Sequence, residues 1–200
     1  MTKKLLVATR NSGKVREFSR MLSGVCFEVV GLDDLGIDLE VEETGSTFEE
    51  NAVLKARAYA EASGELTLAD DSGLVVDALN GEPGVLSARY GGDGLDDEGR
   101  VQLVLDKMEH LPGWERTAKF VAVLALVGGD VPSGLATSEG VLEGAIMHQP
   151  IGENGFGYDP VFWLASQAKT TAQLSGEEKD AISHRGAALR GLTDTLASLA

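Results

Sequence analysis

Apolar and polar residues alternate along the chain in periods that predict an α/β fold. Strands are predicted where apolar residues form continuous or alternating runs: residues 3–8, 25–30, 66–70, 74–79, 117–127, 135–147 and 161–164. Helices are predicted where apolar residues recur every three or four positions: residues 14–22, 47–62, 96–108 and 177–199. The two longest extended runs are separated only by Gly128–Gly134, so we expect them to pair as an antiparallel hairpin.

Composition and charge narrow the class of protein. The chain has 200 residues, of which 43% are hydrophobic and 24% charged, which predicts one folded domain over residues 1–200. Its formal net charge of −15 argues against a nucleic acid polymer or a membrane surface as a partner, because like charges repel over about 10 Å in salt. No apolar run approaches the roughly 20 residues of a membrane span and no signal-peptide core is present, so we expect a cytoplasmic protein. Cys26 lies in an apolar run and is predicted to be a buried thiol.

Two adjacent carboxylates, Asp70 and Asp71, form the centre of the predicted chemistry. They follow the apolar run Leu66–Ala69 and precede Ser72 and the turn-permissive Gly73. Because an extended backbone sends successive side chains to opposite faces, only one of the two acids can point into a given site, and the other must support it. An acidic turn at the end of a strand is the alternative interpretation, since such turns are common.

Donors for phosphate are predicted in the first loop. Thr9–Lys14 (TRNSGK) joins a predicted strand to a helix N-terminus, where backbone N–H groups and the helix dipole favour phosphate. The loop is not a Walker A motif, because Ala8 and Val15 stand where that motif needs Gly and Ser or Thr. An ordinary strand-to-helix connection is therefore the alternative. Lys55 lies one helical turn after Asn51 and adds a second cation if its helix packs beside the loop.

A platform for a flat ligand is predicted around Phe156. Glycines on both sides let the backbone approach a ligand closely, while Phe156 and Tyr158 offer ring faces and Asp159 a carboxylate. Three cationic side chains lie near the start of the last predicted helix, and a solvated basic patch is the alternative for them: Lys179, His184 and Arg185. With Asp70–Asp71 and Glu42 or Glu43 as oxygen ligands suited to Mg²⁺, these segments predict a nucleoside triphosphate site.

The order and spacing of these motifs resemble the non-canonical purine nucleoside triphosphate pyrophosphatase family (inosine/xanthosine triphosphate pyrophosphatases, Ham1-like). The matching motifs span nearly the whole chain: Thr9–Lys14 (TRNSGK), Glu42–Ala52 (EETGSTFEENA), Ala69–Gly73 (ADDSG), Pro83–Tyr90 (PGVLSARY), Gly155–Pro160 (GFGYDP) and Ser183–Gly186 (SHRG). The resemblance implies an elongated central mixed sheet flanked by helices, with two lobes around a central cleft. It also implies hydrolysis of ITP, dITP and XTP to the monophosphate and pyrophosphate, with Mg²⁺, by a cytoplasmic homodimer that removes non-canonical nucleotides from the pool.

By position, the resemblance implies roles for individual residues. Asp71 would be the catalytic proton acceptor and a metal ligand, and Glu42, or the adjacent Glu43, the second metal carboxylate. The residues expected to bind substrate are Thr9, Arg10, Asn11, Ser12, Gly13, Lys14, Ser72, Phe156, Gly157, Tyr158, Asp159, Lys179, His184 and Arg185. Three further residues are expected to support them: Asn51, Lys55 and Asp70.

Several chemical alternatives fit the same residues. A water molecule activated by a carboxylate can attack the α- or the γ-phosphorus, so residue types alone leave pyrophosphate and orthophosphate release both open. A nucleotide sensor without turnover would need the same binding groups, and Asp70–Asp71 alone would fit a phosphomonoesterase with an aspartyl nucleophile. For base choice, His184 and Arg185 are donors that suit the 6-keto oxygen of inosine or xanthine and oppose the amino group of adenine.

Overall fold

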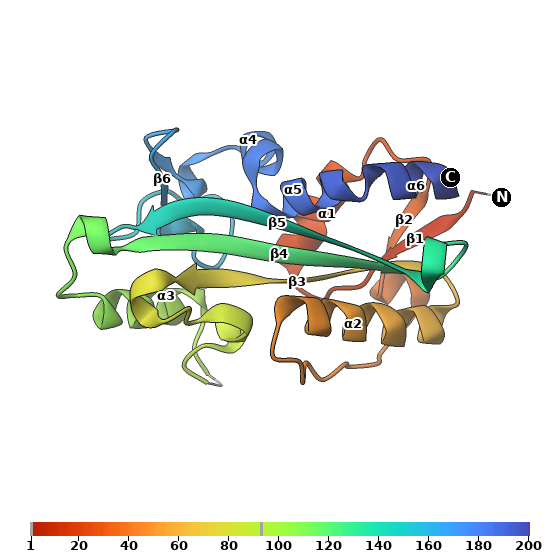
Figure 1. Cartoon of the computed structure of the whole chain (residues 1–200), viewed down its shortest axis with the longest axis horizontal. Coiled ribbons are helices and arrows are strands. Elements are labelled where there is room, and N and C mark those ends of the chain that lie inside the picture. The colour runs from red at the N-terminus through yellow and green to blue at the C-terminus, as the bar shows by residue number, and fades with distance from the viewer. Residues whose placement is uncertain (1, 93) are drawn as a thin grey trace. The chain divides into compact units, whose positions relative to one another are not determined.

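The computed structural model describes residues 2–92 and 94–200 (Figure 1). Its strands are β1 Lys4–Val7, β2 Glu28–Gly31, β3 Leu66–Val76, β4 Thr117–Val127, β5 Leu135–Ile146, β6 Phe162–Leu164 and β7 Lys169–Thr170. Its α-helices are α1 Ser12–Met21, α2 Phe48–Ser63, α3 Asp97–Lys107, α4 Gly176–Ile182, α5 His184–Gly191 and α6 Thr193–Leu199. Short 3₁₀ turns include η1 Asp33–Leu35, η3 Gly84–Arg89, η6 Asp159–Val161 and η7 Thr171–Gln173. Within the described residues, no helix is long and apolar enough to cross a membrane.

The strands form one mixed sheet in the order β2-β1-β3-β4-β5-β6-β7. Strand β1 pairs in parallel with β2 and β3, so that Leu6 lies opposite Val30 on one side and Thr67 on the other. Strand β6 is antiparallel to both β5 and β7. Figure 1 shows β4 and β5 running in opposite directions, as the predicted hairpin requires. The mixed sheet flanked by helices confirms the α/β fold class.

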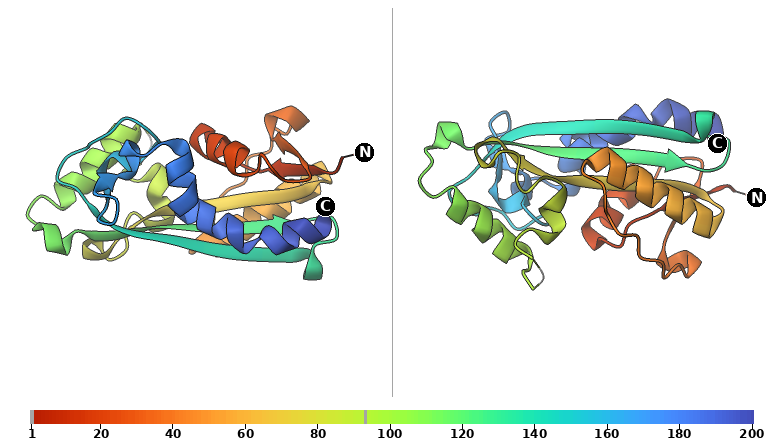
Figure 2. Two further views of the ribbon diagram at one scale, coloured as in Figure 1. Left: turned by 90° about the horizontal axis from the view of Figure 1, so that it is seen from above. Right: turned by 60° about the horizontal axis from the view of Figure 1, so that its bottom comes forward.

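The chain divides into two compact units. Unit 1 contains Met1–Asp71, Ala122–Gly140 and His184–Ala200, and unit 2 contains Ser72–Val121 and Val141–Ser183. Unit 1 has a core on each face of its strands, because successive residues of β1 point to opposite sides. Leu5 belongs to the core that α1, α5 and α6 cover, whereas Leu6 belongs to the core under α2. Figures 1 and 2 show these helices on the two faces of the unit 1 strands.

Unit 2 has one core, which gathers apolar side chains from β3, α3, β4 and β6. At its centre the rings of Phe120 and Phe162 lie 4.2 Å apart between centroids. Arg116 is 1% exposed and donates hydrogen bonds to the carbonyl oxygens of Met108, Ile146 and Met147. This buried guanidinium ties the end of α3 to the end of β5, since an unpaired buried charge would be costly.

The break predicted between the strands over residues 66–70 and 74–79 is wrong, because β3 continues without interruption from Leu66 to Val76. Gly73 is therefore not a turn residue. A Cβ atom at this position would lie 2.3 Å from Ser87 Oγ and 2.5 Å from the carbonyl oxygen of Gly84. Only glycine lets η3 pack this closely on β3, and that long-range contact leaves no local sequence pattern.

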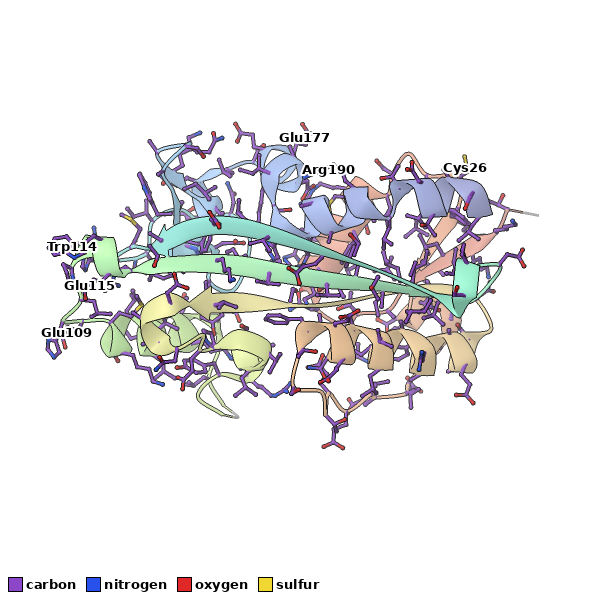
Figure 3. All side chains as sticks on the ribbon, in the orientation of Figure 1. Cys26, Glu109, Trp114, Glu115, Glu177 and Arg190 are labelled. Atoms are coloured by element: carbon purple, nitrogen blue, oxygen red, sulfur yellow. The ribbon has the colours of Figure 1, made fainter. Side chains whose placement is uncertain are left out.

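Two further predictions need correction. The single helix expected over residues 177–199 is three helices. The first break is at Ser183, where the backbone is extended (φ −67°, ψ 159°) and the chain passes from unit 2 to unit 1, and the second is at Leu192 (φ −101°, ψ 0°). Cys26 is exposed rather than buried (Figure 3). The second strand begins only at Glu28, so Cys26 lies before it and does not take part in its inward alternation.

Candidate active site

Asp70 is the centre of a buried charge network in unit 1. It is 2% exposed, and its Oδ2 atom lies 2.6 Å from Lys14 Nζ and 3.5 Å from Arg185 Nε. The Nη1 atom of Arg185 also lies 3.0 Å from the Oε2 atom of Glu17, so α1, β3 and α5 are joined by ion pairs. Burial favours the neutral acid, but Lys14 and Arg185 outweigh it and hold the pKa of Asp70 well below its usual value. Asp70 is therefore ionised, and it holds two cations in place.

Asp71 faces the other side of β3, toward α2. Its Oδ1 atom lies 3.0 Å from Lys55 Nζ, and its Oδ2 atom accepts a hydrogen bond from Asn51 Nδ2 at 3.3 Å. Lys55 Nζ also pairs with Glu43. Burial raises the pKa of Asp71, and the neighbouring Glu43 adds to this effect against the opposing charges of Lys55 and Lys14. Asp70 and Asp71 thus lie on opposite faces, as alternation along a strand requires, and differ in basicity.

Lys55 lies between two carboxylates. Burial lowers its pKa, but Asp71 and Glu43 together outweigh burial and raise the pKa above the ordinary lysine value. The opposite holds for Lys14, whose pKa burial lowers despite the nearby charge of Asp70. Lys55 is therefore firmly cationic, while Lys14 releases its proton more easily than an exposed lysine.

The loop before α1 is shaped by its own side chains. The Asn11 side chain caps the helix by accepting a hydrogen bond from the Lys14 N–H at 3.0 Å, and Thr9 Oγ1 accepts one from the Asn11 N–H at 3.2 Å. These contacts begin the helix at Ser12. Arg10 takes no part in these capping contacts, and its guanidinium donates to the carbonyl oxygen of Ile37 at 2.6 Å.

A second buried cluster lies in unit 2 around Asp159. Its Oδ2 atom accepts hydrogen bonds from Lys179 Nζ and from the Phe156 N–H at 2.9 Å, and its Oδ1 atom accepts one from Thr171 Oγ1 at 2.9 Å. Lys179 Nζ also lies 5.0 Å from the centroid of the Phe156 ring, within cation–π distance. Gly155 has a φ of +78°, and a Cβ atom there would lie 2.0 Å from Asp159 Oδ2, so the glycine is required by this packing.

The loop that carries Phe156 has further anchors in unit 2. The Tyr158 hydroxyl donates to the carbonyl oxygen of Ser87 at 2.9 Å, and the Gly157 N–H donates to Asp97 Oδ2 at 2.9 Å. Burial raises the pKa of Tyr158, so its hydroxyl stays protonated and acts as a donor. The sequence analysis did not identify these anchors, since no local pattern links η3 or α3 to this loop.

Comparison with known proteins places the chain in a family. A family model described as the Ham1 family matches residues 5–195. The chain belongs to the Ham1 family. It is 46% identical to a dITP/XTP pyrophosphatase of Bacillus cereus, over 97% of this chain and 95% of that protein. It is 47% identical to a dITP/XTP pyrophosphatase of Shigella flexneri, over 96% of this chain and 98% of that protein.

Solved Ham1 structures share the fold. The Ham1 protein of Staphylococcus aureus has a TM-score of 0.85 and 43% identity, and covers 98% of this chain and 99% of its own. A HAM1 protein of Coxiella burnetii has a TM-score of 0.87 and 41% identity, with the same coverage. The resemblance drawn from the motifs and the mixed-sheet fold are both confirmed.

In this Ham1 chain, the three basic side chains near the C-terminus belong to different units. Lys179, His184 and Arg185 are all buried, so the alternative of a solvated basic patch is wrong. Lys179 belongs to unit 2 with Asp159, whereas Arg185 belongs to unit 1 with Asp70. The helix breaks at Ser183, between Lys179 and Arg185, so these two residues do not lie on one continuous helix.

The donor set around Asp71 fits a magnesium ion. In the described part of the chain, no three His, Cys, Asp or Glu side chains gather as a metal-holding group, but the carboxylates of Asp71 and Glu43 share Lys55. Mg²⁺ needs only one or two carboxylates when phosphate oxygens and water complete its shell. Glu42 is exposed and Glu43 is half-buried, so Glu43 is the better placed of the two adjacent acids.

Proposed function

We propose that this Ham1-family chain hydrolyses dITP, XTP and ITP to the nucleoside monophosphate and pyrophosphate. The observation that supports it best is the pair of largely buried lysines, Lys14 and Lys55, beside the two adjacent acids of β3. In a protein of net charge −15, these two lysines are suited to holding a small polyanion that the rest of the surface repels. The names of the curated relatives, dITP/XTP pyrophosphatases, supply the substrate class.

In this proposal Asp71 is the general base. Water is a poor nucleophile toward an anionic triphosphate, so a carboxylate takes its proton as the water oxygen bonds to the α-phosphorus and pyrophosphate leaves. Lys55 and Asn51 fix the two oxygen atoms of Asp71, and a bound magnesium ion would keep the pKa of its carboxyl group low, so that the base stays ionised. Asp70, whose pKa is depressed, is the supporting acid that orients Lys14 and Arg185.

Magnesium is the proposed cofactor. Asp71 and Glu43 would hold it, with Glu43 in the role first assigned to Glu42, because Glu43 already approaches Lys55 beside Asp71. When bound, the ion supplies positive charge that neutralises phosphate oxygens. Lys14, Lys55 and the N-terminal turn of α1 would supply the rest of the positive charge that the triphosphate needs.

Base recognition is assigned to aromatic and hydrogen-bonding groups. Phe156 offers a ring for stacking, and the buried Lys179–Asp159 pair and the backbone anchors of its loop fix that ring. His184 and Arg185 are proposed as donors to the 6-keto oxygen of hypoxanthine or xanthine. Gly157 lets the backbone approach the base closely, and Ser72 contributes a hydroxyl group to nucleotide binding.

The cellular setting is also a proposal. We infer a cytoplasmic homodimer that removes non-canonical nucleotides, without a nucleic acid polymer or a membrane as partner. The strongly acidic surface supports the last two points, and the family membership supports the others.

A substrate panel tests the proposal. Purified protein is assayed with dITP, XTP, ITP, dATP and dGTP during a magnesium titration, and pyrophosphate and orthophosphate are measured separately. We expect magnesium-dependent pyrophosphate release that is fastest with dITP or XTP and is abolished by Asp71→Asn but not by Glu61→Gln, an exposed acid on α2. Tight binding without turnover would instead indicate a sensor, and a trapped phospho-aspartate would indicate a phosphomonoesterase.

A further inference from the structure

The segment before α2 has no regular structure of its own. This connector, residues 36–47, forms neither helix nor strand, and it carries Glu43. Figure 2 shows it running alongside α2. Because no strand ladder fixes it, its position depends on side chains that reach it from other elements.

Arg10 is one of these side chains. Its Nη2 atom donates to the carbonyl oxygen of Ile37 at 2.6 Å and lies 3.5 Å from that of Leu39, while Nη1 lies 3.3 Å from Asp33 Oδ1. Asp33 is almost fully exposed, so water screens the ion pair, and the shortest contact of the guanidinium is the one with the carbonyl oxygen of Ile37. A planar guanidinium suits this arrangement, because its donors leave in fixed directions.

Other contacts fix the connector along α2. The Tyr59 hydroxyl donates to the carbonyl oxygen of Leu39 at 3.1 Å, so this oxygen is approached from both α2 and the first loop. Further along, Asn51 Oδ1 accepts a hydrogen bond from the Gly45 N–H at 2.7 Å, and Lys55 pairs with Glu43. Arg10 thus links the first loop to the start of the connector that carries Glu43.

We infer that Arg10 is a positioning residue that holds the connector, and through it Glu43, rather than a ligand of the substrate phosphates. Turning the guanidinium toward a phosphate would release the carbonyl oxygen of Ile37, which would then lose its donor at 2.6 Å. The link also joins two parts of the proposed site, because Arg10 belongs to the loop Thr9–Lys14 and Glu43 belongs to the connector. Its catalytic consequence rests on the proposed function, whereas the restraint on the connector does not.

Hydrogen exchange tests the restraint in the substrate-free protein. The amides of Ile37, Thr44 and Gly45 are hydrogen-bonded and report opening of the connector. We expect Arg10→Ala to speed their exchange by about fivefold or more, the factor for one ordinary hydrogen bond. We expect Arg10→Lys to have a smaller effect, since lysine can still donate to one carbonyl. Arg16→Ala, which removes an exposed cation from the adjacent helix, is the matched control and should change nothing.

A second measurement separates the two roles of Arg10. Tripolyphosphate binding to the metal-free protein is measured by calorimetry, and we expect Arg10→Ala to weaken it by less than about twofold, with the KM for dITP similarly unchanged and kcat reduced. Unchanged amide exchange in Arg10→Ala would overturn the inference, as would a tenfold loss of tripolyphosphate affinity. Faster exchange in a protein that turns over no nucleotide would support the restraint and count against the proposed function alone.

Discussion

Replacing Lys55 with methionine should destabilise the protein and make its stability increase more steeply as the pH falls. Lys55 and Asp71 are mostly buried, with side chains 11% and 7% exposed, and Lys55 also neutralises Glu43. Removing one partner of such a buried pair costs about 3–5 kcal/mol, because the remaining charge is left uncompensated. In Lys55→Met two carboxylates would face each other without their ammonium, so the pKa of Asp71 should rise further above its ordinary value.

The sign of the pH dependence follows from proton linkage. A carboxyl group with a pKa raised by folding binds more protons in the folded than in the unfolded state, so stability increases as pH falls. One extra bound proton gives a slope of about 1.4 kcal/mol per pH unit at most. The variant should therefore lose most stability at neutral and alkaline pH and recover part of it as the pH falls toward 5.

Urea unfolding at several pH values between 5 and 8 measures this effect. Arg57→Met, which removes an exposed cation from the same helix, is the control and should behave as the wild type. If Lys55→Met lost less than about 1 kcal/mol, the range of a surface ion pair, and kept the wild-type pH profile, the buried ion-pair reasoning would be refuted.

Three other substitutions test separate contacts. Asp70→Asn should lower the free energy of unfolding at pH 7 by about 3 kcal/mol because it leaves two buried cations uncompensated, and urea unfolding measures the loss. The stability that Asp70 gives the wild type is present above the ordinary carboxyl pKa and is lost as pH falls through its depressed folded-state pKa, so the variant's acid limb should be flatter. Gly73→Ala should destabilise unit 2 by about 1–3 kcal/mol because the added Cβ meets Ser87 Oγ, and an unchanged melting temperature would contradict this. Thr171→Val keeps the shape but removes a donor to Asp159, so the KM for dITP should rise by about fivefold, the effect of one hydrogen bond, with little change in kcat.

Much of the fold follows from local periodicity. The bounds predicted for the two long strands, residues 117–127 and 135–147, differ from β4 and β5 by at most one residue, because long alternating runs have one stable arrangement. The opposite orientation of Asp70 and Asp71 also followed from the two-residue period of a strand, and their contacts with different helices agree with it.

The features that sequence reasoning missed depend on distant contacts. Gly73 is needed because η3 packs on β3, and Thr171 matters because it reaches Asp159, which lies in another turn. Glu42 and Glu43 could not be separated, since the connector lacks the periodicity that would tell which side chain points inward. Arg10 was assigned to phosphate by its place in a motif, although its nearest acceptor lies on the connector.

In the proposed reaction, Asp71 activates water to attack the α-phosphorus. Turnover of dITP in water enriched with ¹⁸O tests it directly, because the attacked phosphorus keeps the oxygen of the water. We expect the label in the nucleoside monophosphate and none in the pyrophosphate. Label in orthophosphate or in pyrophosphate would contradict it.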